Sequence, residues 1–359
     1  MRVLIVALPL VGHTLPMLPL AVALRAAGHD VQLATGGDAL VADTGPLTVH
    51  DVGADLPPTS AWRLVLGNPV LSAKVATGRG GAAGAALVLQ SINAGIVAPV
   101  RALAAQWRPD LVVHDPMAIA APIVAAELGV PAVLHGNALM DVEELRSAVI
   151  ERHGLGALPP AALALDIAPP SVVGPRPGLS LRTVPWSGQG AVPEWLARPA
   201  DRPRIVVSRS TINGGPGADP IPAVVRAAAA VDAEIVLVRP ASEAKLPGNV
   251  RTVGWVPLDQ VLPHCTAVVH HGGAGTVLGA LVAGIPQLVV PGIGDRRINA
   301  DLIARRGAGL AAPSRSITAE VLRRLIADDE LAAAAREVQQ EIAALPGPAE
   351  VVPELARLT

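Results

Sequence analysis

The stretch Ala267-Val-Val-His-His-Gly-Gly-Ala-Gly-Thr276 says more about the fold class of this chain than any other part of its sequence. A short apolar run leads into closely spaced glycines and a small hydroxyl residue, and an apolar helical pattern follows. This order predicts a buried strand that turns directly into a helix, where backbone N–H groups bind an anion such as phosphate. The alternative is a tight turn in which the glycines serve only close packing.

The two histidines of this stretch, His270 and His271, add side-chain donors beside the turn. Strand alternation predicts that their imidazoles face opposite ways. The turn contains no lysine, so it is not the Walker loop of nucleoside triphosphatases.

Apolar runs alternate with helical patterns over the first part of the chain. Continuous apolar runs predict buried parallel strands at 2–8 and 31–35, joined by a helix over about 13–27. The same kind of unit recurs with strands at 111–114 and 131–134. Such units indicate a parallel sheet with helices on its faces.

A second alternating series follows a proline-rich stretch at 159–203, which we interpret as an inter-domain connection. Its strands are predicted at 204–208, 234–238, 251–254, 267–270 and 287–290. The sequence therefore predicts the α/β class with two doubly wound domains, at 1–200 and 204–359, and ligands at the carboxyl ends of the strands.

Composition sets limits on the class of protein. The chain has 359 residues, of which 51% are apolar and 16% charged, and its net charge is −2. The near-neutral charge argues against nucleic acid as a partner. One cysteine, Cys265, excludes an intrachain disulfide and, with the histidines, forms no zinc spacing. Because no signal peptide or membrane-spanning run is recognised, we expect a cytoplasmic protein without stable membrane insertion.

Two further elements flank the glycine stretch: Gly254-Trp-Val-Pro257 before it and Pro291-Gly-Ile-Gly-Asp-Arg-Arg-Ile-Asn-Ala300 after it. In order and spacing, the three elements resemble the C-terminal half of GT-B glycosyltransferases, closest to the bacterial family that attaches deoxysugars to antibiotic aglycones. The resemblance implies two Rossmann-like domains facing a central cleft. It also implies that the last helix, at about 348–358, crosses back to the N-terminal domain.

His13 is the candidate catalytic base. It follows the first strand, so it should lie at the carboxyl edge of the sheet, and an imidazole that titrates near neutrality suits proton removal from a hydroxyl. The family carries its base in a Gly-His motif with a proline three residues later, which matches Gly12, His13 and Pro16 here. The alternative is a helix N-terminal residue that only caps backbone groups.

Asp115 follows strand 111–114 and should lie at the same edge as His13. A carboxylate bonded to an imidazole fixes the imidazole's tautomer and stabilises its protonated form. Alternatively, Asp115 caps the helix expected to begin near Pro116. Asp110 precedes the strand and should lie at the opposite edge.

The resemblance also implies a set of donor-binding residues in the C-terminal half. His271 would donate to the diphosphate, Trp255 would stack on the nucleotide base, and Asp295 with Arg296 would bind the donor sugar. The full set is Thr211, Trp255, Val256, His271, Gly273, Ala274, Gly275, Thr276, Asp295 and Arg296.

This chain departs from the family pattern at two positions, and at a third it differs from plant enzymes. Ser210 replaces a glycine before Thr211, and Arg296 replaces a glutamine. Leu258 stands where plant enzymes that use UDP-sugars have glutamine, which favours a thymidine diphosphate (dTDP) donor. Arg209 is either a phosphate contact or a surface arginine.

Each of these assignments has a purely structural alternative. Trp255 could be buried between strand and helix, and Asp295 and Arg296 could form a surface salt bridge. Because loop amides and His271 would hold the diphosphate, and no Asp-x-Asp cluster stands in a suitable loop, we expect neither a metal nor another cofactor.

These features together predict a metal-independent, inverting glycosyltransferase that moves a deoxysugar from dTDP to a small apolar aglycone. The Ala- and Gly-rich segment 53–100 is the predicted apolar wall for this acceptor. The alternatives are a nucleotide-sugar epimerase on the same fold and a non-catalytic nucleotide-sugar-binding partner of another transferase. The sequence leaves the oligomeric state open, with a homodimer as one option.

Overall fold

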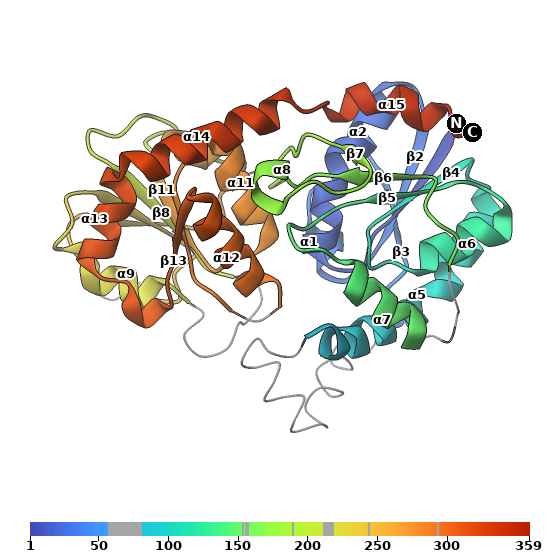
Figure 1. Ribbon diagram of the computed structural model, residues 1–359, viewed down its shortest axis with the longest axis horizontal. Coiled ribbons are helices and arrows are strands. Elements are labelled where there is room, and N and C mark those ends of the chain that lie inside the picture. Colours follow the sequence, from blue (N-terminus) through green and yellow to red (C-terminus); the bar gives the residue numbers. More distant parts are fainter. Residues whose placement is uncertain are drawn as a thin grey trace. The chain divides into compact units, whose positions relative to one another are not determined.

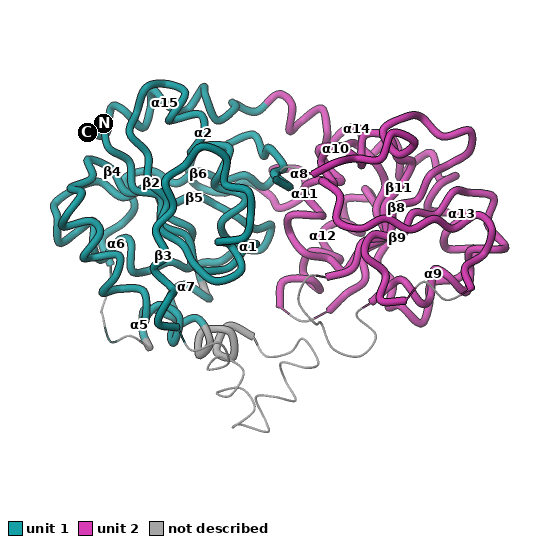
Figure 2. The backbone as a smooth tube through the Cα atoms, turned by 180° about the vertical axis from the view of Figure 1, so that it is seen from behind, with its two compact units in different colours: residues 1–168, 175–188, 345–359 teal, residues 169–174, 189–344 magenta. Residues whose placement is uncertain are grey.

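The chain folds into two compact units, each built around one parallel sheet (Figure 2). Unit 1 comprises Met1–Ala168, Pro175–Gly188 and Leu345–Thr359, and unit 2 comprises Pro169–Gly174 and Gln189–Ala344. The computed structural model describes residues 1–56, 81–152, 154, 158–188, 190–210, 219–242, 245–292 and 294–359.

The sheet of unit 1 has the strand order β3-β2-β1-β4-β5-β6-β7, with every pair parallel. Strands β1 and β4 lie at its centre and are almost entirely buried, as their unbroken apolar sequences require. The strands are β1 (Arg2–Val6), β2 (Asp30–Thr35), β3 (Thr48–Asp51), β4 (Leu111–His114), β5 (Ala132–His135), β6 (Leu163–Asp166) and β7 (Leu179–Ser180).

The helices of unit 1 are α1 (Val11–Thr14), α2 (Leu18–Ala26), α5 (Gly81–Trp107), α6 (Ala120–Leu128), α7 (Glu143–Arg152) and α15 (Pro348–Ala356). The C-terminal helix α15 lies beside α2 near the N-terminus, so the two ends of the chain meet (Figure 1). At this meeting point the Thr359 hydroxyl lies 3.9 Å from the sulfur of Met1.

The sheet of unit 2 has the order β10-β9-β8-β11-β12-β13, again with parallel pairs throughout. The strands are β8 (Arg204–Ser208), β9 (Glu234–Val238), β10 (Val250–Val253), β11 (Ala267–His270), β12 (Gln287–Val289) and β13 (Gly309–Ala311). The helices are α8 (Pro170–Val173), α9 (Ile221–Ala228), α10 (Leu258–Val261), α11 (Ala274–Ala283), α12 (Arg296–Arg306), α13 (Ala319–Ala327) and α14 (Asp329–Ala344).

Both faces of the second sheet are covered. Along β8, Ile205 and Val207 pack into a core cluster with residues of α9 and α13, whereas Val206 between them packs into a second cluster with Val261 of α10. Because successive side chains of a strand point to opposite sides, β8 contributes to the apolar core on both faces of the sheet. The predicted α/β class with two doubly wound sheets is confirmed.

The structure differs from the sequence-based expectation in three places. The helix predicted over 13–27 is divided, because a 3-10 turn at Leu15–Met17 separates α1 from α2. The segment 159–203 is not a structureless connection, since β6, α8 and β7 lie within it and β6 pairs with β5. Along the chain, the last passage from unit 1 to unit 2 falls after Gly188 rather than near residue 200, and unit 1 also includes 345–359.

A helix that spans a membrane must be both long and apolar. None of the helices within the described ranges is both long and apolar enough to cross a bilayer. The segment 57–80, which forms part of the predicted acceptor wall, lies outside the described residues.

Candidate functional site

His13 and Asp115 meet at the carboxyl edge of the first sheet. Strands β1 and β4 are parallel neighbours with Val6 paired to His114, so the residues that follow them emerge at the same edge. Helix α1 carries His13, and Asp115 comes directly after β4. The Nδ1 atom of His13 lies 3.1 Å from Oδ1 of Asp115.

The carboxylate of Asp115 is fully buried and held by backbone donors. The N–H of Leu8 donates to Oδ2 at 2.6 Å, and that of Met117 donates to Oδ1 at 2.7 Å. Burial raises the pKa of Asp115, but the opposing effects of His13 and of these hydrogen bonds are larger together and leave the pKa below its usual value. Asp115 is therefore an anion at neutral pH.

The two interpretations of Asp115 are compatible in the structure. The bond from Met117 closes a turn directly after β4, so Asp115 also caps backbone groups. Helix α6 begins only at Ala120, later than the expected start near Pro116. Asp110 lies at the opposite end of β4, where it accepts the backbone N–H of Arg2 at 2.6 Å.

Asn137 is a neighbour of His13 that the sequence analysis missed. Its amide nitrogen is placed 3.1 Å from the same Nδ1 that faces Asp115, and its side chain is almost fully buried. A protonated Nδ1 donates to Asp115 and cannot also accept. Turning the Asn137 amide by 180° exchanges its nitrogen and oxygen. The amide oxygen then faces Nδ1 of His13 and accepts the same N–H as Asp115. Its position just after β5, at the same edge of the sheet, was the signal in the sequence.

This arrangement fixes the proton of His13 on Nδ1 and leaves Nε2 as the basic nitrogen. The imidazole is 25% exposed, whereas its carboxylate partner is 0% exposed. General-base catalysis needs a base that the substrate can reach. A buried anion beside that base orients it and stabilises its protonated form.

Two further histidines at this edge are unsuited to take up a proton at neutral pH. The Nδ1 atoms of His114 and His135 lie 2.8 and 2.7 Å from the backbone oxygens of Asp115 and Gly136. Burial lowers the pKa of each imidazole to about 4. Both are therefore neutral structural groups.

In unit 2 the glycine stretch forms the predicted strand-to-helix turn between β11 and α11. Gly272 has φ +84°, and a Cβ added there would lie 3.0 Å from Cγ1 of Val289. Gly273 caps α11, and a Cβ added to it would lie 2.7 Å from Nε2 of His271. Both glycines are thus required for close approach, and the second makes room for the His271 imidazole.

The two histidines of the turn have different surroundings. His270 is fully buried; its Nδ1 accepts the N–H of Gly272 at 3.0 Å, and its Nε2 lies 2.9 Å from Oε1 of Gln287. His271 has a buried Nδ1 without a hydrogen-bond partner among the described residues. His270 therefore holds the turn together, whereas His271 retains hydrogen-bonding capacity.

The N-terminus of α11 supplies backbone donors beside His271. The N–H groups of Thr276 and Val277 both bond to the carbonyl oxygen of Gly273. The N–H groups of Ala274 and Gly275 lie at the very start of the helix, where the helix itself provides no carbonyl partner for them. This is the local geometry of an anion site at a helix N-terminus.

Trp255 is exposed, whereas the next residue, Val256, is buried. Trp255 is 53% exposed, and the guanidinium carbon of Arg239 lies 5.1 Å from the centroid of its ring. The alternative of a buried tryptophan is therefore wrong. Val256 is only 4% exposed and packs in the core, so its side chain cannot reach a donor and only its backbone can.

Asp295 and Arg296 do not form a surface salt bridge. Arg296 is 8% exposed and donates from Nη2 to Oγ of Ser210 at 2.9 Å, and Oδ2 of Asp295 accepts from Asn299 at 2.9 Å. Arg209 is half-buried. Thr211 lies outside the described residues.

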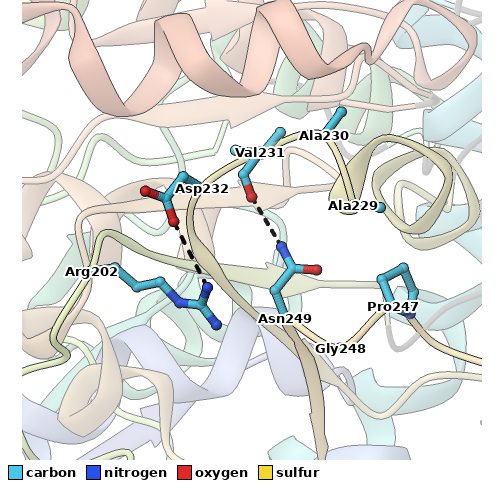
Figure 3. A pocket seen from close by; sticks show the side chains of 8 residues that line it. All are labelled: Arg202, Ala229, Ala230, Val231, Asp232, Pro247, Gly248 and Asn249. Atoms are coloured by element: carbon cyan, nitrogen blue, oxygen red, sulfur yellow. Dashed lines mark hydrogen bonds and ion pairs between the residues drawn. The ribbon is translucent and has the colours of Figure 1, made fainter.

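A separate hollow of about 620 Å³ lies at the other end of the second sheet. Figure 3 shows its lining side chains, with Arg202 facing Asp232 and Asn249 bonded to the carbonyl of Val231. These residues precede β8, β9 and β10, so the hollow is at the amino ends of the strands. It is remote from the glycine turn.

In the part of the chain that the structure describes, no three His, Cys, Asp or Glu side chains converge in a way that could hold a metal ion.

Comparison with known families gives two matches. The N-terminal domain model of the erythromycin biosynthesis protein CIII-like family matches residues 22–210, and its C-terminal domain model matches residues 222–358. The elloramycin glycosyltransferase of Streptomyces olivaceus is 39% identical over 99% of this chain and 97% of its own length. The L-demethylnoviosyl transferase of Streptomyces niveus is 36% identical, over 99% and 98%.

Solved structures give the same picture. The glycosyltransferase SnogD from Streptomyces nogalater matches with a TM-score of 0.85 at 36% identity, covering 100% of both chains. The glycosyltransferase VinC, solved in complex with dTDP, matches with a TM-score of 0.81 at 32% identity, covering 100% of this chain and 99% of VinC. The fold of this chain therefore matches that of solved glycosyltransferases.

Proposed function

The chain belongs to the erythromycin biosynthesis protein CIII-like family of glycosyltransferases, and from this premise we propose that it transfers a deoxysugar from dTDP to a natural-product aglycone with inversion. The enzyme class and the use of a nucleotide sugar with a small-molecule aglycone follow from family membership. The finer statement rests on one observation above all, the pairing of an accessible His13 with the buried anion Asp115.

The proposed reaction is a single displacement. Nε2 of His13 takes the proton of the acceptor hydroxyl while the hydroxyl oxygen attacks the anomeric carbon, and the bond from that carbon to the diphosphate oxygen breaks. Asp115, 3.1 Å from Nδ1, stabilises the imidazolium that forms. The two electrons of the broken bond remain on the nucleoside diphosphate, which the glycine turn of unit 2 binds.

Three observations support dTDP as the nucleotide. VinC was solved with dTDP, and so was the spinosyn rhamnosyltransferase SpnG, which is 28% identical. Leu258 occupies the position at which plant enzymes that use UDP-sugars have glutamine. The half-exposed indole of Trp255 offers a flat face for a pyrimidine base.

The deoxysugar and the aglycone are supported by the relatives. Several are named for the transfer of such sugars, including the TDP-daunosamine transferase of Streptomyces peucetius, 31% identical over the full length of this chain. Named acceptors among them are tylactone and aklavinone, which are useful first probes.

Transfer should proceed without a divalent metal. The first amides of α11 and the side chain of His271 supply donors for the diphosphate, so the leaving group needs no added cation. We expect wild-type protein with a dTDP-sugar to release dTDP only when aklavinone or tylactone is present, and at the same rate in excess EDTA. A UDP-sugar in the same assay should react more slowly.

The outcomes of this assay separate the proposals. Loss of activity in EDTA that Mg²⁺ restores would contradict the metal-independent site. Release of nucleotide without an aglycone would indicate an epimerase or a hydrolase. Binding of dTDP without any turnover across the acceptor panel would indicate a non-catalytic partner.

A further inference from the structure

Four cationic or imidazole side chains follow four neighbouring strands of the second sheet. Strands β9, β8, β11 and β12 are consecutive in the sheet. Arg239 directly follows β9, Arg209 follows β8, His271 follows β11, and Arg296 lies at the start of α12 after β12. Because parallel strands deliver these positions to one edge about 4.8 Å apart, the four groups gather beside the glycine turn.

Arg296 packs directly on that turn. A Cβ added to Gly272 would lie 3.2 Å from Cβ of Arg296, and one added to Gly292 would lie 3.1 Å from its Cδ. The neighbouring Asn299 of the same helix donates to the carbonyl of Gly272 at 2.9 Å. The stem of the Arg296 side chain therefore packs against the backbone of the anion site, and its guanidinium bonds to Oγ of Ser210.

The charges of this cluster are poorly compensated. Arg296 is 8% exposed, and its Nη1 has no hydrogen-bond partner among the described residues. The buried Nε of Arg239 likewise has none. No ion pair found in the described ranges involves Arg209, Arg239 or Arg296. The carboxylate of Asp295 raises the pKa of Arg296, but burial has the larger and opposite effect, so this pKa lies below its usual value. A buried guanidinium whose charge is incompletely balanced is destabilising, which points to an anionic ligand.

Arg239 is also held in an unusual backbone conformation. Its φ is +51°, a region that residues other than glycine rarely adopt. The conformation places its guanidinium over Trp255, the residue proposed to stack on the base. Backbone strain of this kind concentrates at ligand sites.

The imidazole of His271 cannot provide the missing positive charge. Burial lowers the pKa of His271 to about 3, with further lowering from His270, Arg296 and Arg239. His271 is therefore a neutral donor at pH 7, and the positive charge at the turn comes from arginine. A nucleotide sugar carries two negative charges on its diphosphate, and two guanidinium groups balance them.

From this geometry we infer that Arg239 and Arg296 form a guanidinium pair that binds the diphosphate of the donor, in addition to the amides of the glycine turn. The inference rests on the proposed nucleotide-sugar donor. It assigns Arg296 to phosphate instead of the sugar hydroxyls that the family resemblance suggested, and it adds Arg239, which the resemblance did not include.

The test is calorimetry with two probes, dTDP and inorganic pyrophosphate, on R296Q and R239Q. Loss of a hydrogen bond to a charged group should weaken the binding of both probes by about 10- to 100-fold for each variant. Binding should also depend less on NaCl concentration than in wild type. The matched control is R297Q, because Arg297 is the next residue of α12 and is exposed.

Thermal unfolding of the ligand-free variants distinguishes binding from structural support. Removing an unpaired buried charge should leave the Tm of R296Q equal to or above that of wild type, whereas a structural role would lower it. Binding of both probes within a factor of two of wild type would overturn the inference. So would an R296Q variant that binds both probes normally and shows only a raised KM for the sugar donor.

The wild-type measurements keep the two proposals apart. Wild-type protein that binds pyrophosphate and UDP but not dTDP would contradict the proposed nucleotide and leave the guanidinium pair intact. If the wild-type protein binds neither dTDP nor pyrophosphate, the inference that Arg239 and Arg296 bind the diphosphate is wrong.

Discussion

Replacing His13 by alanine should lower the turnover number by about two to four orders of magnitude, the usual contribution of a positioned general base. The reason is that neither of the two other described histidines at this edge can replace it. His114 and His135 have a pKa of about 4 because they are buried, and Asp115 is enclosed by backbone donors. Steady-state rates with a dTDP-sugar and a hydroxyl acceptor measure the effect.

The donor should still bind to this variant. The glycine turn belongs to unit 2 and His13 to unit 1, so the Kd for dTDP should stay near the wild-type value. His29→Ala is a suitable control, because His29 lies in unit 1 beside the N-terminal amine and away from the carboxyl edge. Turnover of His13→Ala within a factor of a few of wild type would mean that another group is the base.

The second large effect is expected from Asp115→Asn, which should lower turnover by about two to three orders of magnitude. The asparagine retains the shape of the side chain but removes the negative charge that faces Nδ1 of His13 at 3.1 Å. The imidazolium formed during proton uptake would then lose its stabilising partner. The affinity for dTDP should again be unchanged.

The control for this variant is Asp110→Asn at the opposite end of the same strand. Asp110 also accepts a backbone N–H, but its side chain is 40% exposed and lies at the amino edge. Asp115 accepts two backbone N–H groups, so the Tm of both variants should be measured beside their rates. A rate loss in Asp115→Asn that disappears at temperatures well below its Tm would show that the role is only structural.

The topology explains why much of the site could be predicted from the sequence. Unbroken apolar runs such as 205–207 identify buried parallel strands, and the carboxyl ends of such strands share one edge. His13 and Asp115 were therefore placed together from two motifs about a hundred residues apart. The same rule applied to β5 would have indicated Asn137.

Other features depend on packing that a strand pattern does not encode. The burial of Arg296 depends on how α12 lies on the turn at Gly272, and the exposure of Trp255 depends on which side of β10 is covered. The burial of Val256 follows from packing against α10 and the strands. The proline-rich segment 159–203 concealed β6, because four paired residues are too few to show a periodicity.

The most direct test of the central claim is the anomeric configuration of the product, read from the ¹H NMR coupling of its anomeric proton. A single displacement with His13 as the base attacks the face opposite the diphosphate, so the configuration should be opposite to that of the dTDP-sugar. Retention would need a different course, such as two displacements through a covalent glycosyl–enzyme intermediate on a carboxylate. A product with the donor's own configuration would therefore contradict the mechanism proposed for His13 and Asp115.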